Sequence, residues 1–474
     1  MTKKNKNVQQ KAFISNKGVN LNKSLPKVLV DIFKQGDIFT KLSFLIMGFS
    51  NIVRGQIIKG CIFLLSQISF IYFMFMNKGG LFMLKGLTTL GEIDTIEPTG
   101  FQPRIPGDDS RKFLLFGIIT VLVCLLFILL WSESIKSGYI AELATKNGKK
   151  PNTFIEDVKD YFDSKIHRTF LLIPLMGIFV MTIIPILDMI CMAFTNFDKN
   201  HNGENERFTW TGLATFGKVL NMGNGSKYSY TFWHVLGWTL IWAVIATFSC
   251  YIGGIIIAMI INRKSIKFKT LWRTLFIMSA ATPQFVTLLL MRSFLQDRGL
   301  LNGILVNLGL CSSFDTAPGW LSDPMLAKVM VLVVNLWIGI PFTIMITTGI
   351  LQNIPEELYE AAKMDGASTR TIFFKITMPY MIFVTTPYLI QTFIGNINNF
   401  NVIYLLTAGK PTNMNYDNAG HTDLLVTWLY KLSLDYKEYN VASAIGILVF
   451  VITATFSLLV YRRSGSYNNE EEFQ

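Results

Sequence analysis

Residues 353–379 read NIPEELYEAAKMDGASTRTIFFKITMP, a polar loop between two long apolar runs. Pro355 suits the first turn of a helix, and the glutamates after it lie where the helix dipole favours negative charge. Gly366 can take the left-handed conformation that ends a helix. The loop therefore predicts a short helix, with an alanine-rich face at Ala361 and Ala362 that another protein could approach closely.

Long apolar runs flank this loop and recur along the chain. A membrane helix needs about 20 mostly apolar residues. Of the 474 residues, 51% are hydrophobic and only 16% are charged, whereas soluble domains carry about 25% charged residues. The composition predicts an all-α polytopic membrane protein. About eight runs qualify as transmembrane helices, near 55–76, 113–131, 169–194, 233–262, 271–295, 328–351, 377–398 and 441–461.

The charges between these runs predict the orientation. With a cytoplasmic N-terminus, the inside segments hold 27 Lys and Arg and the outside segments 13, while acidic residues number 15 on each side. The positive-inside rule then places both termini and the loop 353–379 in the cytoplasm. The first apolar run starts too far from Met1 for a cleaved signal peptide. The basic excess thus indicates topology and contact with anionic lipid, and no nucleic-acid partner is expected.

The chain carries no catalytic or metal-binding pattern. Its five cysteines never fall at CxxC spacing, and its four histidines form no HExxH motif. Residues 212–218 fit GxxxxGK, but Val219 stands where a phosphate-binding loop needs Ser or Thr, and the topology places this loop outside the cell. We expect no enzyme activity, no metal and no cofactor in this chain, with any ATP and Mg²⁺ bound by a partner subunit.

The cytoplasmic loop resembles a known family. EAA at 360–362, Gly366 and ITMP at 376–379 are similar to the EAA loop of ABC importer permeases, with Met378 in place of Leu. In that family the EAA helix seats in a cleft of the ATP-binding subunit and transmits its closure to the membrane helices. The resemblance implies a set of ATPase-coupling residues: Leu358, Tyr359, Glu360, Ala361, Ala362, Asp365, Gly366 and Pro379.

Residues 337–368, 396–412 and 420–430 look like the larger membrane subunit of maltose/maltodextrin importers. This implies the type I ABC importer permease fold, a multi-pass location in the cell membrane and import of maltodextrin-type oligosaccharides by alternating access. The implied partners are a smaller second permease, two copies of an ABC ATPase and an extracellular sugar-binding lipoprotein. The loop 195–232 is short, which fits the Gram-positive type, because Gram-negative relatives carry a whole domain there.

The resemblance also divides the chain into four expected parts. Residues 1–54 form a basic cytoplasmic arm with an interfacial helix, and residues 55–168 form the first two transmembrane helices with their loops. Residues 169–463 form the permease core of about six transmembrane helices, and residues 464–474 form a cytoplasmic tail.

The seventh apolar run carries the expected sugar contacts. Tyr388, Thr392, Asn396 and Asn399 fall at i, i+4, i+8 and i+11, on one face of a helix. Polar groups within the membrane are costly, so this face should look into the bundle or a cavity. Together with family positions, this gives a set of substrate-binding residues: Ile338, Gly339, Phe342, Tyr388, Thr392, Gly395, Asn396 and Asn399.

Two of these positions depart from the family pattern. Phe342 stands where the family has Tyr, and Gly395 where it has Phe, which removes a hydroxyl and a stacking ring. We expect a wider pocket that takes a longer or branched oligosaccharide. Asn398 and Asn401 point elsewhere and are expected to cap a helix or hydrogen-bond neighbours.

Other interpretations stay open at this point. Each asparagine can bond a neighbouring helix without touching a ligand. Asp188, the one acidic residue within a run, fits a local polar contact at the outer end of the third helix or a role in proton coupling. A secondary transporter or channel without an ATPase explains the apolar runs but not the EAA spacing. A membrane-embedded enzyme finds no catalytic residues to support it.

Overall fold

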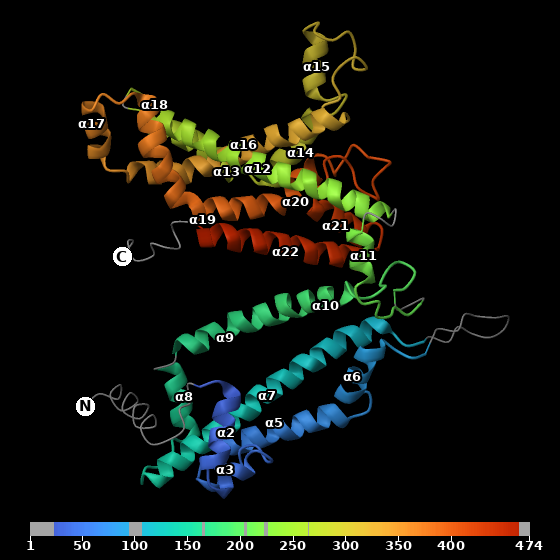
Figure 1. The fold of residues 1–474 in the computed structure, drawn as a ribbon, viewed down its shortest axis with the longest axis vertical. Helices are drawn as coiled ribbons and strands as arrows, with labels where there is room; N and C mark the ends of the chain where they lie inside the picture. The colour runs from blue at the N-terminus through green and yellow to red at the C-terminus, as the bar shows by residue number, and fades with distance from the viewer. Residues whose placement is uncertain are drawn as a thin grey trace, which may run out of the picture. The chain divides into compact units, whose positions relative to one another are not determined.

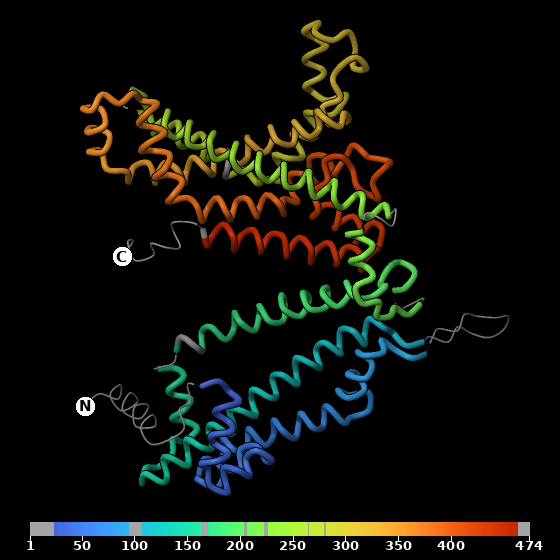
Figure 2. Tube along the Cα trace, in the orientation of Figure 1, coloured from blue at the N-terminus to red at the C-terminus, as the bar shows by residue number. Residues whose placement is uncertain are grey.

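The computed structural model describes residues 23–93, 107–163, 166–202, 206–221, 226–263 and 265–463. The first 22 residues of the expected basic arm and the tail 464–474 lie outside these ranges. Within them the chain is helical, with only two isolated β-bridges, so the all-α prediction is confirmed. The chain forms two compact units, residues 1–210 and residues 211–474 (Figures 1 and 2).

The first unit contains three long apolar helical segments joined by short helices. Its elements are α2 (Leu25–Gln35), α3 (Ile38–Leu42), α4 (Phe49–Val53), α5 (Ile57–Phe75), α6 (Gly80–Thr89), α7 (Ser110–Lys146), α8 (Phe154–Phe162), α9 (Ile166–Ile178), η1 (Phe179–Ile183) and α10 (Ile184–Met192).

The segment before α5 is anchored to α7 by a buried polar network. The carboxylate of Glu142, on α7, accepts hydrogen bonds from the Asp37 N–H at 3.1 Å and the Thr40 hydroxyl at 2.7 Å. Arg54 pairs with Asp37 at 2.5 Å, and Lys146 with Glu142 at 2.5 Å. The Glu142 side chain is 1% exposed, so its buried negative charge is stabilised by these partners instead of by water. Residues 24–53 thus form a folded, helical part of the expected arm.

Asp37 carries the charge that Arg54 neutralises. Burial alone would raise the pKa of Asp37, but hydrogen bonds from Arg54 and Thr40, with the attraction of Arg54, hold that pKa below its usual value. The carboxylate therefore stabilises the fold at neutral pH, and this contribution is lost as the pH falls through the folded-state pKa.

The second unit holds the loop that resembles the EAA motif. Its elements are α11 (Ala214–Leu220), α12 (Lys227–Asn262), α13 (Lys269–Ala281), α14 (Gln284–Phe294), α15 (Leu300–Asn307), α16 (Pro324–Gln352), α17 (Glu356–Met364), α18 (Thr369–Ile372), η3 (Phe373–Thr377), α19 (Met378–Ile397), α20 (Phe400–Leu406), α21 (Leu425–Leu434) and α22 (Tyr439–Arg463).

Seven helical segments of the described chain are long and apolar enough to cross a membrane. The prediction of one helix over 271–295 is wrong, because the chain breaks into α13 and α14 at Thr282 and Pro283. A proline disfavours helical geometry in the residue before it, and Thr282 is accordingly extended (φ −73°, ψ 129°). Together α13 and α14 run back from the end of α12 toward α15 (Figure 1).

Helices α12 and α16 pack closely because small residues line their contact. A Cβ on Gly339 would lie 2.6 Å from the sulfur of Cys250. A Cβ on Gly254 would lie 2.5 Å from Thr343. Trp242 of α12 is fully buried, and its indole N–H donates to the Asn396 carbonyl at 3.1 Å. These contacts join α12, α16 and α19 into the core of the second unit.

The network around Glu142 predicts a large effect of its removal. In the variant Glu142→Ala, the Asp37 N–H, the Thr40 hydroxyl and Lys146 lose the carboxylate that accepts their hydrogen bonds, so the free energy of unfolding should fall by about 3 kcal/mol. Thermal unfolding of the purified protein, followed by tryptophan fluorescence, measures this loss. The control Glu133→Ala removes a carboxylate from the same helix that is 63% exposed and pairs with Lys136, and it should cost under about 1 kcal/mol. Equal losses in the two variants would contradict the network.

Candidate functional site

Helix α17 stands apart from the other helices of the second unit. None of its residues is buried, and Leu358 and Met364 are 47% and 89% exposed. It lies at one end of the unit, the same end at which α22 finishes, opposite α15 and α21 (Figure 1). A short helix with exposed apolar side chains gains little stability by itself, so this surface is suited to a partner protein.

The predicted start and stop of this helix are confirmed to within one residue. Pro355 precedes the first helical residue, Glu356, instead of lying inside the first turn. Gly366 has φ +75°, the left-handed conformation expected of it. The Ala367 N–H donates to the Ala362 carbonyl at 2.9 Å, which closes the helix end.

One side-chain hydrogen bond connects α17 to the membrane helix that follows. The Tyr359 hydroxyl lies 3.2 Å from the Thr377 hydroxyl, and Thr377 ends η3 directly before α19. Pro379 has no N–H to donate to the carbonyl of Lys375, and the wider π turn of η3 lies where this bond is missing. Tyr359 and Thr377 thus link α17 to the start of α19.

The eight expected ATPase-coupling residues are exposed or partly buried. Tyr359 and Ala362 are partly buried; the remaining six are exposed, namely Leu358, Glu360, Ala361, Asp365, Gly366 and Pro379. Their contact with an ATPase stays a prediction.

The expected sugar contacts divide between α16 and α19. Tyr388 links these helices, because its hydroxyl lies 3.3 Å from that of Thr343. Thr392 donates to the Tyr388 carbonyl at 2.8 Å, within its own helix. Both side chains are partly exposed, and their oxygens remain able to accept a further hydrogen bond.

The Asn396 side chain takes part in packing between helices. Its side chain is 7% exposed, and its amide donates to the Thr247 hydroxyl of α12 at 2.9 Å. Its amide oxygen lies 3.4 Å from the Asn399 side-chain nitrogen. Hydrogen bonding between helices, left open above, therefore describes Asn396 well in this conformation.

The prediction of four polar residues on one helix face is wrong for Asn399. Helix α19 ends at Ile397, and Asn399 is the N-cap of α20, where its oxygen accepts from the Val402 N–H at 3.3 Å. Asparagine favours such caps because its short side chain bonds the free N–H groups of a helix start. Asn398 bonds the Ile394 carbonyl at 3.2 Å, as expected of a neighbour-bonding residue.

The remaining expected sugar contacts differ in exposure. Gly339 packs against α12, and Ile338 is partly buried against the hydrophobic core of the unit. Phe342 is 51% exposed, and no atom lies within 4 Å of a Cβ built on Gly395. The two positions that depart from the family pattern are thus the open ones.

Gln284 is a polar residue that the sequence reasoning missed. It is the first residue of α14, directly after the break at Pro283, and its amide oxygen accepts from the Asn401 side chain at 3.3 Å. This bond joins the helix break at Pro283 to the break before α20. The combination of Pro and Gln within one apolar run was the signal that could have indicated it.

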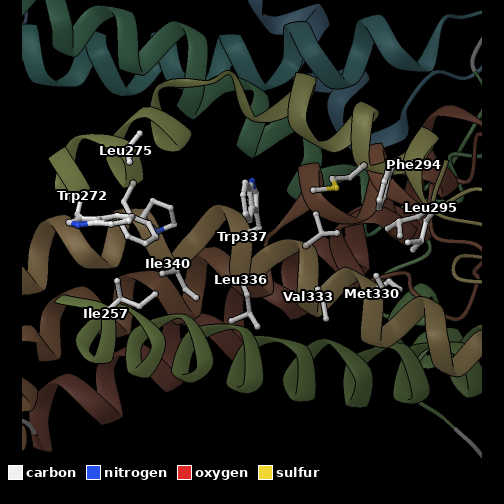
Figure 3. A pocket seen from close by; sticks show the side chains of 15 residues that line it. Ile257, Trp272, Leu275, Phe294, Leu295, Met330, Val333, Leu336, Trp337 and Ile340 are labelled. Carbon is white, nitrogen blue, oxygen red and sulfur yellow. The ribbon is translucent and has the colours of Figure 1, made fainter. Parts of the chain in front are cut away.

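A cavity of about 630 Å³ lies between α13, α14 and α16 (Figure 3). Its lining is nearly all apolar and includes Trp272, Phe276, Met291 and Trp337. None of the eight expected sugar contacts lines it. A sugar needs hydrogen-bonding partners for its hydroxyls, so this cavity is better suited to hydrocarbon than to a sugar.

The loop before α21 is held by a buried ion pair that the sequence reasoning also missed. Asp423 is 0% exposed; it accepts from the Gly420 N–H at 2.7 Å and the Thr427 hydroxyl at 2.9 Å, and pairs with Lys431 at 2.7 Å. Gly409, with φ +77°, lies directly against this carboxylate. The loop therefore keeps a fixed shape beside α20.

Known proteins match the chain over nearly its whole length. Residues 250–464 match the family described as "Binding-protein-dependent transport system inner membrane component". The maltodextrin transport system permease protein MdxF of Bacillus subtilis is 32% identical, over 90% of this chain and 95% of the relative. The galactooligosaccharides transport system permease protein GanP of the same organism is 31% identical, over 90% and 97%.

A solved structure supports the fold. A bacterial alginate ABC transporter, in complex with a periplasmic protein bound to an alginate pentasaccharide, matches with a TM-score of 0.50 and 20% identity. The match covers 66% of this chain and 98% of that one. At this identity the likeness concerns the fold alone.

Gly409 predicts a sharp difference between two matched variants. Gly309→Ala and Gly409→Ala both place an alanine at a φ near +70°, but only the second meets Asp423, whereas the first meets no atom within 4 Å. We expect Gly309→Ala to cost about 1 kcal/mol of unfolding free energy and Gly409→Ala at least about 2 kcal/mol more. Thermal unfolding of the two purified variants measures both. Equal destabilisation of the two variants would show that the Asp423 carboxylate can move aside without a measurable cost in stability.

Proposed function

The chain belongs to the family of ABC sugar importer permeases of the maltodextrin type, and we propose that it passes maltodextrin-type oligosaccharides into the cell by ATP-driven alternating access. It is a multi-pass membrane protein, and its relatives are transport permease subunits, not enzymes. The observation that carries the proposal is an exposed helix α17, with the EAA residues on it, in a chain related to such permeases over nine tenths of its length.

In this proposal α17 receives the motion of an ATPase subunit. Glu360 and Ala361 present an exposed acidic and small surface, and Tyr359 transmits displacement through Thr377 to α19. Helix α19 in turn bonds α12 through Asn396 and Thr247. A movement of α17 would therefore reach the helices that carry the sugar contacts through hydrogen bonds, without relying on the loops.

The proposed partners follow from the family. A second, smaller permease completes the path, two copies of an ABC ATPase bind ATP and Mg²⁺, and an extracellular lipoprotein delivers the sugar. The end of the second unit opposite α17, where α15 and α21 lie, is the proposed docking side of that lipoprotein (Figure 1). We propose no cofactor or metal in this chain itself, and no group of metal-ligating side chains occurs in its described part.

The proposed substrate is a neutral oligosaccharide. Tyr388, Thr392 and Asn399 offer hydroxyl and amide groups without formal charge, which suits sugar hydroxyls better than the carboxylates of an acidic sugar. Relatives for α-linked maltodextrins and for galactooligosaccharides are nearly equally similar. The maltodextrin proposal rests on the resemblance of residues 337–368 and 396–412 to maltose permeases.

A secondary transporter is the alternative. It needs no partner ATPase, so it leaves the exposed surface of α17 without a role. Uptake that continues when the ATPase is inactivated would favour it.

Reversal of the charge at Glu360 tests the proposal. In cells that carry Glu360→Lys, uptake of labelled maltodextrin should fall at least tenfold while the amount of protein in the membrane is unchanged, because the ATPase cleft would meet the wrong charge. Glu133→Lys, an exposed reversal on α7, should keep wild-type uptake. Normal uptake in the Glu360 variant would contradict the proposal that α17 couples the permease to the ATPase.

Loss of the Tyr359 hydroxyl should weaken the coupling itself. In Tyr359→Phe the ring stays but the bond to Thr377 is lost, at a cost of about 1 kcal/mol, or roughly a fivefold effect. In proteoliposomes with all subunits, we expect fewer sugars transported for each ATP hydrolysed. The exposed control Tyr72→Phe should leave this ratio unchanged. An unchanged ratio in the Tyr359 variant would exclude this bond as the link.

A further inference from the structure

We propose that Phe400, Tyr404 and Tyr430 form an outer sugar subsite that takes the additional rings of an oligosaccharide longer than the inner site holds. The inference of this aromatic subsite rests on the proposed function, because it concerns the length of the same oligosaccharide substrate. The aromatic subsite lies next to Asn399 in the chain and lies outside the eight expected sugar contacts.

The three rings form one cluster contributed by α20 and α21. Phe400 and Tyr404 stack with centroids 4.8 Å apart and planes at 20°. Tyr430 meets Phe400 at 4.8 Å and Tyr404 at 5.1 Å, edge to face. All three side chains are partly exposed. A cluster of this kind presents a broad aromatic surface that is already in place before a ligand arrives.

The amphipathic character of α20 explains this placement. Val402, Ile403 and Leu406 are fully buried in the core, whereas Phe400 and Tyr404, one turn apart, lie on the other side. The rings are thus not needed to fill the core beneath α20. Their surface remains available to a ligand or to lipid.

Polar and charged residues lie on or near the same helix. The Asn401 amide bonds Gln284 at 3.3 Å, and Asn401 is exposed. Arg292 and Asp435 lie close enough to Tyr404 to act on it electrostatically. Aromatic faces with amides and charged groups at the edge match the two surfaces of a sugar ring, an apolar face and a rim of hydroxyls.

The position of the subsite fits an entering chain. Helix α20 starts directly after Asn399, and it lies toward the end of the unit opposite α17 (Figure 1). With α17 on the cytoplasmic side, a sugar that arrives from outside meets the aromatic subsite before Tyr388 and Thr392. A disaccharide at the inner contacts would leave the outer rings unused.

An aromatic belt at the membrane surface is the competing explanation, because Tyr is common where membrane helices meet the headgroups. A belt anchors the helix in lipid and has no reason to distinguish sugars by length. The length dependence of transport therefore separates the two explanations.

The test uses the complete transporter in proteoliposomes, with its ATPase and saturating sugar-loaded binding protein. Uptake rates are measured for labelled maltodextrins of two and six units, and for galactooligosaccharides of the same lengths. Tyr404→Ala and Tyr430→Ala should reduce the rate for the long sugar up to about tenfold and leave the short one within twofold, since a ring contact is worth about one order of magnitude. Tyr404→Phe should restore the long-sugar rate, and Phe450→Ala, an exposed ring on α22, should change neither rate.

Three results would overturn the subsite. Unchanged rates for both lengths would assign the rings to the lipid belt. An equal loss for both lengths would assign them a structural role. If the wild-type transporter takes up neither sugar series, the proposed function fails and this inference fails with it. That failure is recognised before any variant is compared.

Discussion

The structure depends on one constraint: in hydrocarbon, every backbone N–H and C=O must find its partner within the protein, so an interrupted helix needs support from its neighbours. The second unit interrupts its helices at Pro283 and again before Asn399. The bond from Asn401 to Gln284 brings these two breaks together. Asn399, an expected sugar contact, and Phe400, part of the proposed aromatic subsite, lie at the second of these breaks.

The same constraint makes α17 unusual. None of the residues of α17 is buried, and the Tyr359 hydroxyl bonds that of Thr377, directly before α19. Because α17 buries little surface, the proposal expects this helix to move as a unit at a small cost in free energy and to displace α19 through the bond from Tyr359 to Thr377. From α19 the path continues to α12 through Asn396 and Thr247. In this proposal, coupling and substrate contact therefore share helix α19.

Local patterns in the sequence predicted much of this. Apolar length indicated the membrane helices, and Gly366 indicated the end of α17, because both depend on neighbours in the chain. The break at Pro283 was not predicted, since proline is tolerated in membrane helices when neighbours compensate. The role of Asn399 as a cap, and the pairing of Asn396 with a residue 149 positions away, depend on contacts that periodicity does not contain.

The central claim is that α17 is the contact through which an ATPase drives this permease. The most direct test replaces Ala361 by the photoreactive amino acid benzoylphenylalanine in cells that express the whole transporter, and identifies the cross-linked product by mass spectrometry. The account predicts a product with the ATP-binding subunit, together with loss of sugar uptake after illumination. Illumination that yields no protein product and leaves uptake intact would contradict it.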